Sequence, residues 1–185
     1  MVDIPLLILF IMIIEDNNFL TDYHKDQIEN GILSGTFPFY WSEHQVTGDY
    51  LPALLHAVMG RTTKGHVIES DKINSPNFNF CKNVLDTFCN KNNIKYKCIY
   101  RASINLTFHI PREHGKIHED HDFPHKQFLL YLNDSDGDTL LFNDKRKVYK
   151  RIKFEQYKGV VFDRCLHTQE YPTKSRRVVL VITFN

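Results

Sequence analysis

The sequence predicts one α+β domain that is mainly β, with helices in its first half and strands in its second. Its 185 residues are enough for one ordinary domain, and no Pro-, Gly- or Ser-rich linker or internal repeat divides them. Apolar residues at helical spacing occur only before residue 93. Short apolar or alternating runs separated by turn residues follow, as in an antiparallel sandwich or barrel. We therefore expect residues 1–93 to support a β-rich part, 94–185, that carries the functional site.

The composition excludes several classes of protein. Hydrophobic residues make up 42% of the chain and charged residues 24%, which excludes intrinsic disorder and fibrous repeats. The net charge of +1 gives no overall case for a dedicated nucleic-acid binder, although a local basic patch stays open. The four cysteines show no CxxC spacing and predict reduced thiols in a cytoplasmic protein. They are Cys81, which we expect to be buried on a helix, and Cys89, Cys98 and Cys165.

The first apolar stretch, residues 4–14, is eleven residues long and carries no charge. A membrane span needs about 20 residues, and a secretory signal needs a positive start and a small-residue cleavage site. Asp3 precedes the stretch and Glu15 follows it, so we expect a buried strand and no membrane segment. Met12 is an alternative start of translation, in which case residues 1–11 would be an extension that packs poorly.

The next elements are a helix, an edge strand and a second helix. Thr21 is a good N-cap for a helix over residues 22–30, with Gly31 just beyond its end. Residues 37–41 predict a strand, and Pro38 restricts it to a sheet edge because proline has no N–H to donate. Over residues 51–59, apolar side chains fall at i, i+3, i+4, i+7 and i+8, which predicts a helix.

A further helix is expected to begin at Ser75-Pro76 and to end in the Asn-rich stretch 90–93. Its apolar face would hold Phe80, Val84, Leu85 and Phe88. Six strands should then follow, separated by turn residues. They are residues 94–110, 128–132, 139–142, 148–154, 160–162 and 178–184.

His118-Glu119-Asp120 forms a His-x-Asp triplet at the end of a strand-like run. In an extended chain, residues i and i+2 face the same side, so His118 and Asp120 could bind one metal ion. A second triplet, His24-Lys25-Asp26, falls on a predicted helix, where i and i+2 point about 200° apart. The second triplet therefore does not predict a metal site.

His167 adds a second imidazole. It follows the predicted strand 160–162 after a short turn, forty-nine residues beyond His118. Two histidines and a carboxylate form the facial triad that binds Fe(II) and leaves three positions open. Arg177, ten residues further on, could form a bidentate pair with a dicarboxylic cosubstrate. Alternation lets only one of Arg176 and Arg177 face inward, and the spacing from His167 favours Arg177.

The order His-x-Asp, His, Arg at these separations resembles the 2-oxoglutarate/Fe(II)-dependent oxygenases, near their prolyl-4-hydroxylase-like branch. Residues 118–142, HEDHDFPHKQFLLYLNDSDGDTLLF, resemble that branch's His-x-Asp, its YLN and the Gly-rich turn that follows. They look closer still to small oxygenases encoded by marine phages. The resemblance covers residues 95–185 well and the first half only loosely. It implies a double-stranded β-helix, a jelly-roll barrel with iron inside its mouth and the helices of the first half packed outside.

By that resemblance, His118, Asp120 and His167 bind Fe(II), and Arg177 anchors 2-oxoglutarate. The implied reaction uses O2 and oxidatively decarboxylates 2-oxoglutarate to succinate while a substrate is hydroxylated, and ascorbate is a candidate reductant. The Asp120 carboxylate implies hydroxylation, because halogenating relatives carry a small residue in its place. The substrate is unknown, and a peptide side chain such as proline is the first hypothesis, ahead of a small molecule. If the chain is phage-encoded, the location would be the host cytoplasm.

The sequence departs from the family's pattern at Leu130. Many relatives carry a tyrosine there, whose hydroxyl helps to hold the cosubstrate. Here the tyrosine is Tyr131, which alternation would turn to the other face. Either the register slips by one residue, or another polar group, Asn105 or Thr107 on an upstream strand, takes this role.

The remaining histidines are weaker candidates. His121 and His125 lie beside the first triplet and could support the ligands or face the substrate. We expect ordinary surface or core roles for four others, which are His44, His56, His66 and His114.

The stretch from Lys145 to Lys158 holds seven basic residues and one acidic residue. It could contact a phosphate backbone, but basic residues on an exposed hairpin more often form a solvated edge that opposes aggregation. Nucleic-acid dealkylating oxygenases usually carry a second arginine six residues beyond the cosubstrate arginine, where this chain has Thr183. Three functions stay open: a hydroxylating dioxygenase as the leading hypothesis, a non-catalytic jelly-roll module that binds a partner or a sugar, and an oxygenase acting on nucleic acid.

Overall fold

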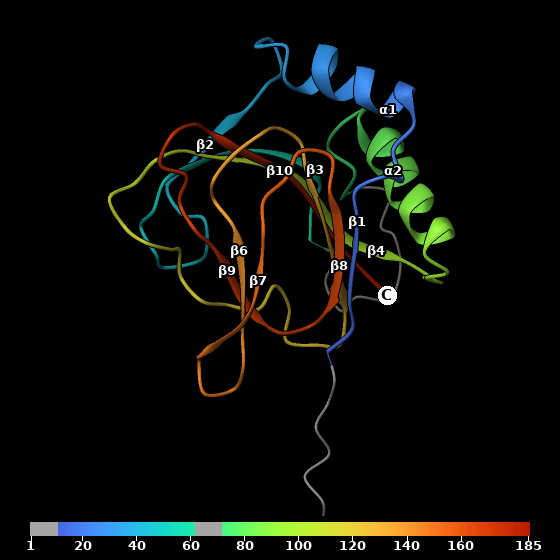
Figure 1. The fold of residues 1–185 in the computed structure, drawn as a ribbon. Coiled ribbons are helices and arrows are strands. Elements are labelled where there is room, and N and C mark those ends of the chain that lie inside the picture. Colours follow the sequence, from blue (N-terminus) through green and yellow to red (C-terminus); the bar gives the residue numbers. More distant parts are fainter. Residues whose placement is uncertain (1–10, 62–71) are drawn as a thin grey trace, which may run out of the picture.

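Two antiparallel sheets face each other in the computed structural model, which describes residues 11–61 and 72–185 (Figure 1). Among these residues, the larger sheet has seven strands in the order β1-β8-β5-β10-β4-β3-β2, and the smaller has three in the order β7-β6-β9. Most neighbouring strands are distant in sequence, as in a jelly roll. The predicted α+β, mainly β jelly-roll fold is confirmed.

The strands in chain order are β1 (Ile13–Asp16), β2 (Tyr40–Ser42), β3 (Ala53–Met59), β4 (Ile99–Thr107), β5 (Lys126–Tyr131), β6 (Thr139–Phe142), β7 (Val148–Ile152), β8 (Gly159–Asp163), β9 (Leu166–Gln169) and β10 (Arg177–Phe184). The helices are α1 (Asp22–Asp26), the π-helix η1 (Gln27–Ile32) and α2 (Phe78–Lys91). None of the described helices is long and apolar enough to cross a membrane.

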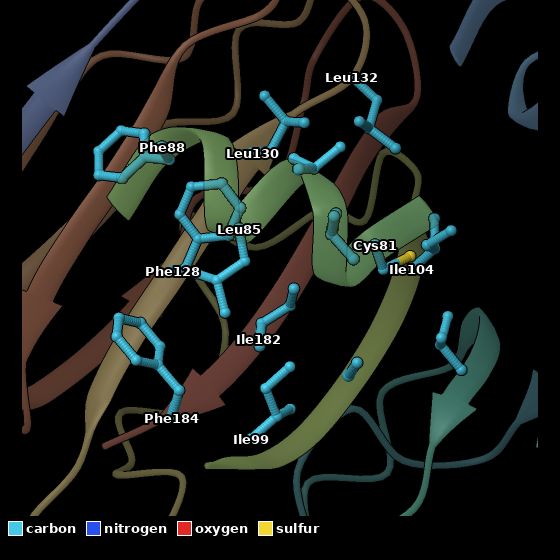
Figure 2. Packing of buried hydrophobic residues seen from close by; sticks show 14 of the residues in the cluster. Cys81, Leu85, Phe88, Ile99, Ile104, Phe128, Leu130, Leu132, Ile182 and Phe184 are labelled. Atoms are coloured by element: carbon cyan, nitrogen blue, oxygen red, sulfur yellow. The ribbon is translucent and has the colours of Figure 1, made fainter. Parts of the chain in front are cut away.

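Helix α2 packs on the outer face of the larger sheet and covers the main hydrophobic core. Its buried residues recur at helical spacing, so Cys81, Leu85 and Phe88 all point toward the strands (Figure 2). They meet alternate residues of β5 and β10, among them Phe128 and Ile182. This burial stabilises the fold by roughly 25 cal/mol per Å² of apolar surface removed from water.

The inner face of the same strands points into the space between the two sheets. Leu129, Tyr131, Val179 and Val181 join residues of β6, β7 and β8 there in a second, smaller apolar cluster. The rest of this space is a cavity lined largely by polar and charged residues. Each central strand therefore has an apolar outer face and a partly polar inner face.

Several predicted elements are confirmed. Helix α2 begins shortly after Ser75-Pro76, and strands occur in all six predicted segments of the second half. Strand β2 lies at the edge of the larger sheet and begins two residues after Pro38. Cys81 is buried on a helix, as expected, and Cys89 and Cys165 are buried thiols.

The helix predicted over residues 51–59 is wrong, because this segment forms β3 between β2 and β4. Its register against β4 shifts between Ala57 and Met59, so that Val58 and Met59 are both buried. This irregularity breaks the two-residue alternation by which a strand is recognised. Pairing along both edges overrides the helical spacing of its apolar residues.

The first helix also differs from its prediction. Thr21 is the N-cap, as expected, and forms a capping box with His24. The α-helix ends at Asp26 and continues as η1, so Gly31 lies inside a helix rather than beyond it. Ile32 of η1 is buried in the main core, which anchors the widened last turns.

Only the end of the apolar stretch 4–14 belongs to the described residues. Ile13 and Ile14 begin β1, which pairs with β8 at the edge of the larger sheet. The expected strand is therefore present in this part, but its residues are half-buried or exposed rather than buried. Residues 4–10 lie outside the described residues, and so does His66.

Gly159 in β8 offers a test of the core packing. A Cβ at this position would lie 2.6 Å from a ring atom of Phe19 and 2.7 Å from one of Phe88. We expect Gly159→Ala to lower the free energy of unfolding by about 1–3 kcal/mol, the cost of overpacking a core. Urea denaturation measures this change. Gly31→Ala is the control because nothing lies within 4 Å of a Cβ there, and equal losses in the two variants would contradict the described packing.

Candidate metal and cosubstrate site

A backbone bridge between distant segments brings two histidines together. The His118 N–H donates to the His167 carbonyl at 3.0 Å, and the His167 N–H donates to the His118 carbonyl at 2.9 Å. Because the two residues are directly opposed, their ring centroids lie 4.6 Å apart. This pair brings together two residues that are forty-nine positions apart in the sequence.

Both imidazoles are oriented by backbone carbonyls. The Nδ1 of His118 lies 2.9 Å from the carbonyl oxygen of Lys116, and the Nδ1 of His167 lies 2.9 Å from that of Cys165. A carbonyl oxygen only accepts, so Nδ1 carries the proton in each ring and Nε2 keeps its lone pair. Burial lowers the pKa of His167 to about 4, which keeps the ring in the neutral form that binds a metal.

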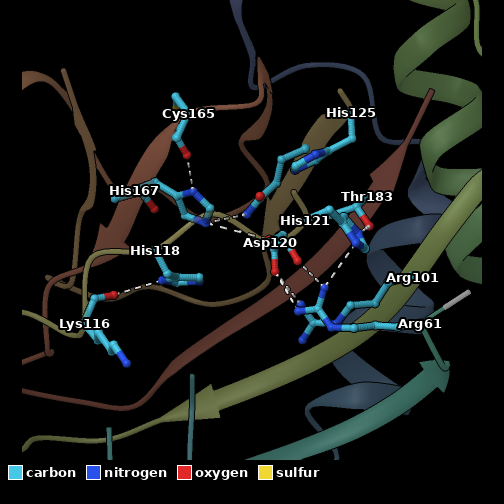
Figure 3. A network of polar contacts seen from close by, with 12 residues as sticks. Arg61, Arg101, Lys116, His118, Asp120, His121, His125, Cys165, His167 and Thr183 are labelled. Atoms are coloured by element: carbon cyan, nitrogen blue, oxygen red, sulfur yellow. Dashed lines mark hydrogen bonds and ion pairs between the residues drawn. The ribbon is translucent and has the colours of Figure 1, made fainter. Parts of the chain in front are cut away.

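Asp120 supplies the carboxylate. Its Oδ2 lies 3.7 Å from Nε2 of His167, and its Oδ1 accepts hydrogen bonds from Arg101 and Arg61 (Figure 3). Burial alone would raise the pKa of Asp120, but the surrounding cationic groups, Arg101 above all, outweigh burial and lower the pKa below its usual range. Asp120 is therefore ionised at neutral pH.

These three side chains are placed to share one metal ion. Their ligand atoms all lie within 4.8 Å of one another. Two imidazoles and one carboxylate are the ligand set of non-haem Fe(II) sites. Over residues 11–61 and 72–185, no other group of three His, Cys, Asp or Glu side chains is so placed. In the second His-x-Asp triplet, residues 24–26, the Nε2 of His24 contacts Asn83 Oδ1 at 2.7 Å.

Arg177 begins β10 and points into the barrel, where it is 6% exposed, whereas Arg176 is exposed to solvent. Its Nε donates to the Gly137 carbonyl at 2.9 Å and its Nη2 to Thr139 Oγ1 at 3.0 Å. Burial lowers the pKa of Arg177 to about 10, so the group stays charged at neutral pH. The described part of the chain forms no ion pair with it, and the nearby Asp138 pairs with an arginine of β7. A ligand carboxylate would offset the cost of this buried charge.

Arg177 and the three candidate metal ligands line one cavity of about 720 Å³. Four polar residues on its wall have a buried oxygen without a hydrogen-bond partner in the described chain: Asn105 Oδ1, Thr107 Oγ1, Gln127 Oε1 and Thr168 Oγ1. Each such atom costs about 1–3 kcal/mol when it is left unpaired. Threonine hydroxyls can donate to a carboxylate. The residues present therefore fit Fe(II) together with 2-oxoglutarate.

The register at Leu130 is shifted by one residue relative to the family's pattern. Leu130 is buried on the outer face, in the main core under α2. Tyr131 shares the inner face with Arg177, which corresponds to the first of the two alternatives, a register that slips by one residue. Its hydroxyl donates to Thr139 Oγ1 at 2.8 Å. Thr139 lines the cavity and accepts from both Tyr131 and Arg177, so its own hydroxyl proton is available to a ligand.

His121 and His125 lie next to the metal ligands. The Nε2 of His121, which lines the cavity, is 2.8 Å from Thr183 Oγ1, and the Nδ1 of buried His125 faces the Phe123 carbonyl at 2.8 Å. Burial lowers the pKa of both imidazoles, that of His121 to about 4. Thr183 stands six residues beyond Arg177, where the nucleic-acid dealkylating oxygenases usually carry their second arginine. It is fully buried here, and its hydroxyl contacts His121.

The histidines expected to have ordinary roles divide into two groups. His56 is buried and bonded to the Pro38 carbonyl and to Ser75 Oγ, and His114 bonds to the neighbouring Gly115 carbonyl. His44 instead lines the cavity, on the loop between β2 and β3. The exposed aromatic side chains of β2 on the other side of this loop, Tyr40 and Trp41, are not among the residues that line the cavity.

The basic stretch from Lys145 to Lys158 forms β7 and its flanking turns. Strand β7 is an edge of the smaller sheet, and the turn before it projects from the barrel (Figure 1). Three of its basic residues form ion pairs with the chain's own carboxylates: Lys150 with Glu15, Arg151 with Glu170, and Lys158 with Glu155. This internal pairing favours a solvated edge over a phosphate-binding surface.

Sequence reasoning missed three residues of the site, namely Arg101, Gln127 and Thr139. Gln127 lies on the inner face of β5, and its Nε2 is 3.2 Å from Nε2 of His167. Arg101 occupies the same face of β4 as Asn105, four residues earlier. A polar residue at an inward position of a predicted strand was the signal that could have found all three.

No family model matches the sequence, and no curated protein matches it. Solved structures with the same fold were found. An oxidoreductase of the 2OG-Fe(II) oxygenase family from Burkholderia pseudomallei matches with a TM-score of 0.69 and 14% identity, over 95% of this chain and 84% of that chain. A prolyl-4-hydroxylase from Pseudomonas putida matches with a TM-score of 0.56 and 12% identity, over 94% and 92%.

A third similar structure is a prolyl hydroxylase from Trichoplax adhaerens in complex with a hypoxia inducible factor peptide fragment. Its TM-score is 0.59 at 16% identity, over 93% of this chain and 82% of that chain. The chain therefore has the fold of the 2OG-Fe(II) oxygenases, prolyl hydroxylases among them, as the sequence resemblance implied.

Replacing His167 tests the metal site. We expect His167→Ala to weaken Co(II) binding by more than the 10- to 100-fold typical of losing an outer partner, because a direct ligand is removed. Isothermal titration calorimetry, with Co(II) added to the purified protein, measures this affinity. His109→Ala is the control, since His109 is exposed and bonds only to the Pro172 carbonyl among the described groups. Equal affinities of the two variants would contradict the site.

Proposed function

We propose that the protein is an Fe(II)- and 2-oxoglutarate-dependent dioxygenase that hydroxylates an organic substrate. The observation that carries this proposal is the convergence on one cavity of two imidazoles, a carboxylate and a buried arginine that forms no ion pair with the described residues. The similarity of the fold to 2OG-Fe(II) oxygenases supports it. In the proposed reaction, 2-oxoglutarate, O2 and the substrate C–H yield succinate, CO2 and the alcohol.

The proposal gives each side chain a physical role. His118, Asp120 and His167 would hold Fe(II), which supplies the redox chemistry of O2 activation when it is bound. Since such a set supplies only three ligands, it would leave other positions open to the cosubstrate and O2. Nδ1–H bonds to backbone carbonyls fix both imidazoles, so that Nε2 faces the ion.

Arg177 would bind the far carboxylate of 2-oxoglutarate by a charge-assisted hydrogen bond. Thr139 and Thr107 would donate hydroxyl protons to the same ligand, and Asn105 would bond to it through its side-chain amide. Val179 and Val181 line the cavity beside them and exclude water from this end. A fixed, dry pocket holds the cosubstrate in one orientation, which is the protein's main contribution to such a reaction. Ascorbate as a reductant stays part of the proposal.

A peptide side chain such as proline is our first substrate hypothesis. The similar Trichoplax adhaerens structure contains a peptide fragment, which supports this hypothesis. The loop between β2 and β3 forms one wall of the cavity. Its conformation is stabilised by Asp49, whose carboxylate accepts hydrogen bonds from three backbone N–H groups of the loop. A fixed wall of this kind can select among substrates. We also propose a cytoplasmic location, in keeping with the buried thiols.

A non-catalytic binding module is the alternative. The completeness of the ligand set argues against it, because a module without chemistry has no need of two oriented imidazoles and a buried carboxylate in one cluster. The two functions differ in a simple observation: only the dioxygenase consumes 2-oxoglutarate in an iron-dependent manner.

Removing the charge of Arg177 tests the cosubstrate site. We expect Arg177→Gln to raise KM for 2-oxoglutarate about 10- to 100-fold, because hydrogen bonds to charged groups contribute about 1.5–3 kcal/mol. Succinate formation in the presence of Fe(II) and a peptide pool measures this constant.

Arg176→Gln is the matched control for this experiment, since the neighbouring side chain is exposed. It should leave KM within about two-fold, as for other surface substitutions. Iron-dependent succinate formation that responds equally to both substitutions would contradict the assignment of Arg177.

A further inference from the structure

Two arginines contact the same oxygen of Asp120. Arg101 Nη1 lies 2.9 Å from Oδ1, and Arg61 Nη2 lies 3.0 Å from it, while Oδ2 lies 3.7 Å from His167 Nε2 (Figure 3). The two oxygens of this carboxylate are therefore in different surroundings. One is held by guanidinium groups, and the other faces the imidazoles.

The two arginines differ in how firmly they are held. Arg101 extends from the inner face of β4, and its side chain is 19% exposed. Arg61 approaches from the chain beyond β3, is 47% exposed, and also donates to the backbone carbonyl of Asp120. The attraction of an exposed guanidinium is screened by water, so Arg101 has the stronger hold on Asp120.

We infer that Arg101 is a positioning residue that makes Asp120 a one-oxygen ligand. This inference rests on the proposed metal site. A carboxylate can bind a metal ion through one oxygen or both. With Oδ1 held by Arg101, only Oδ2 would be available to an ion bound beside His167. A carboxylate bound through both oxygens would fill a position that the cosubstrate or O2 needs.

The charge of Arg101 has a second effect at the same atom. The Asp120 side chain is 4% exposed, and a buried carboxylate without a cationic partner is strongly destabilised. Arg101 supplies that partner whether or not an ion is present. The site is therefore held in its binding geometry before the ion arrives.

Arg164 provides a matched control. Its Nη2 lies 2.7 Å from Oε2 of Glu119, the residue next to Asp120, so it forms a similar ion pair with a carboxylate that is not in the ligand cluster. Arg164→Met removes the same charge close to the site. Arg101→Met removes it from the ligand itself.

Co(II) is the probe, and its affinity and visible spectrum are measured on the full chain. We expect Arg101→Met to weaken Co(II) binding about 10- to 100-fold, as when the partner of a metal ligand is lost. Its visible bands should also change, because Asp120 can then bind through both oxygens and alter the coordination geometry. Arg101→Lys keeps a cation and should restore most of the affinity, whereas Arg61→Met should have a smaller effect and Arg164→Met almost none.

The outcomes separate this inference from the proposed function. If Arg101→Met lowers the affinity no more than Arg164→Met, with an unchanged spectrum, the inference is overturned while the metal site stands. If the unaltered protein binds no Co(II), both are overturned. Thermal melting shows whether each variant is folded. If Arg101→Met is not, Arg101→Gln, which also removes the charge, replaces it: an affinity equal to that of Arg164→Met, with an unchanged spectrum, contradicts the inference.

Discussion

The reciprocal backbone pair between His118 and His167 is the constraint on which the site depends. It fixes two imidazoles opposite each other, at a separation that side-chain contacts alone would not maintain. Asp120 follows two residues after His118 and is carried into the same space by the extended chain. One antiparallel contact thus assembles a ligand set from two distant parts of the sequence.

Most of the apolar packing that stabilises the barrel lies on the outer face of the larger sheet and not in the space between the two sheets. Helix α2 and the outer face of the larger sheet form the main core, whose members are nearly all fully buried. The inner face can therefore keep buried polar groups such as Thr107 and Arg177, each of which costs free energy in the ligand-free protein. Functional sites commonly carry such costs, and the adjacent core offsets them.

The sequence was most informative where chemistry and alternation agree. His118, Asp120 and Arg177 were recognised from the His-x-Asp triplet, in which i and i+2 share a face, and from the order and spacing of the four residues, and the structure places them on one cavity. Their roles toward iron and 2-oxoglutarate stay predictions. The α+β, mainly β fold was predicted for the same reason, since alternation is clear in most strands of the second half.

The failures have particular physical causes. Strand β3 was missed because its register shift at Ala57 and Met59 removes the alternation. The orientation of Tyr131 stayed open at the sequence level because a slip of one residue exchanges the two faces of a strand. Arg101 was missed because its partner Asp120 becomes its neighbour only in the folded barrel, where β4 lies beside the loop that carries the ligand.

Anaerobic spectroscopy of the purified protein tests the central claim most directly. Fe(II) is added first and 2-oxoglutarate second, without O2 or any substrate. A weak visible charge-transfer band should appear only when both are present, because it requires the keto and carboxylate oxygens of 2-oxoglutarate on an iron that the protein holds. A folded protein whose visible spectrum stays unchanged at saturating amounts of both would contradict the account.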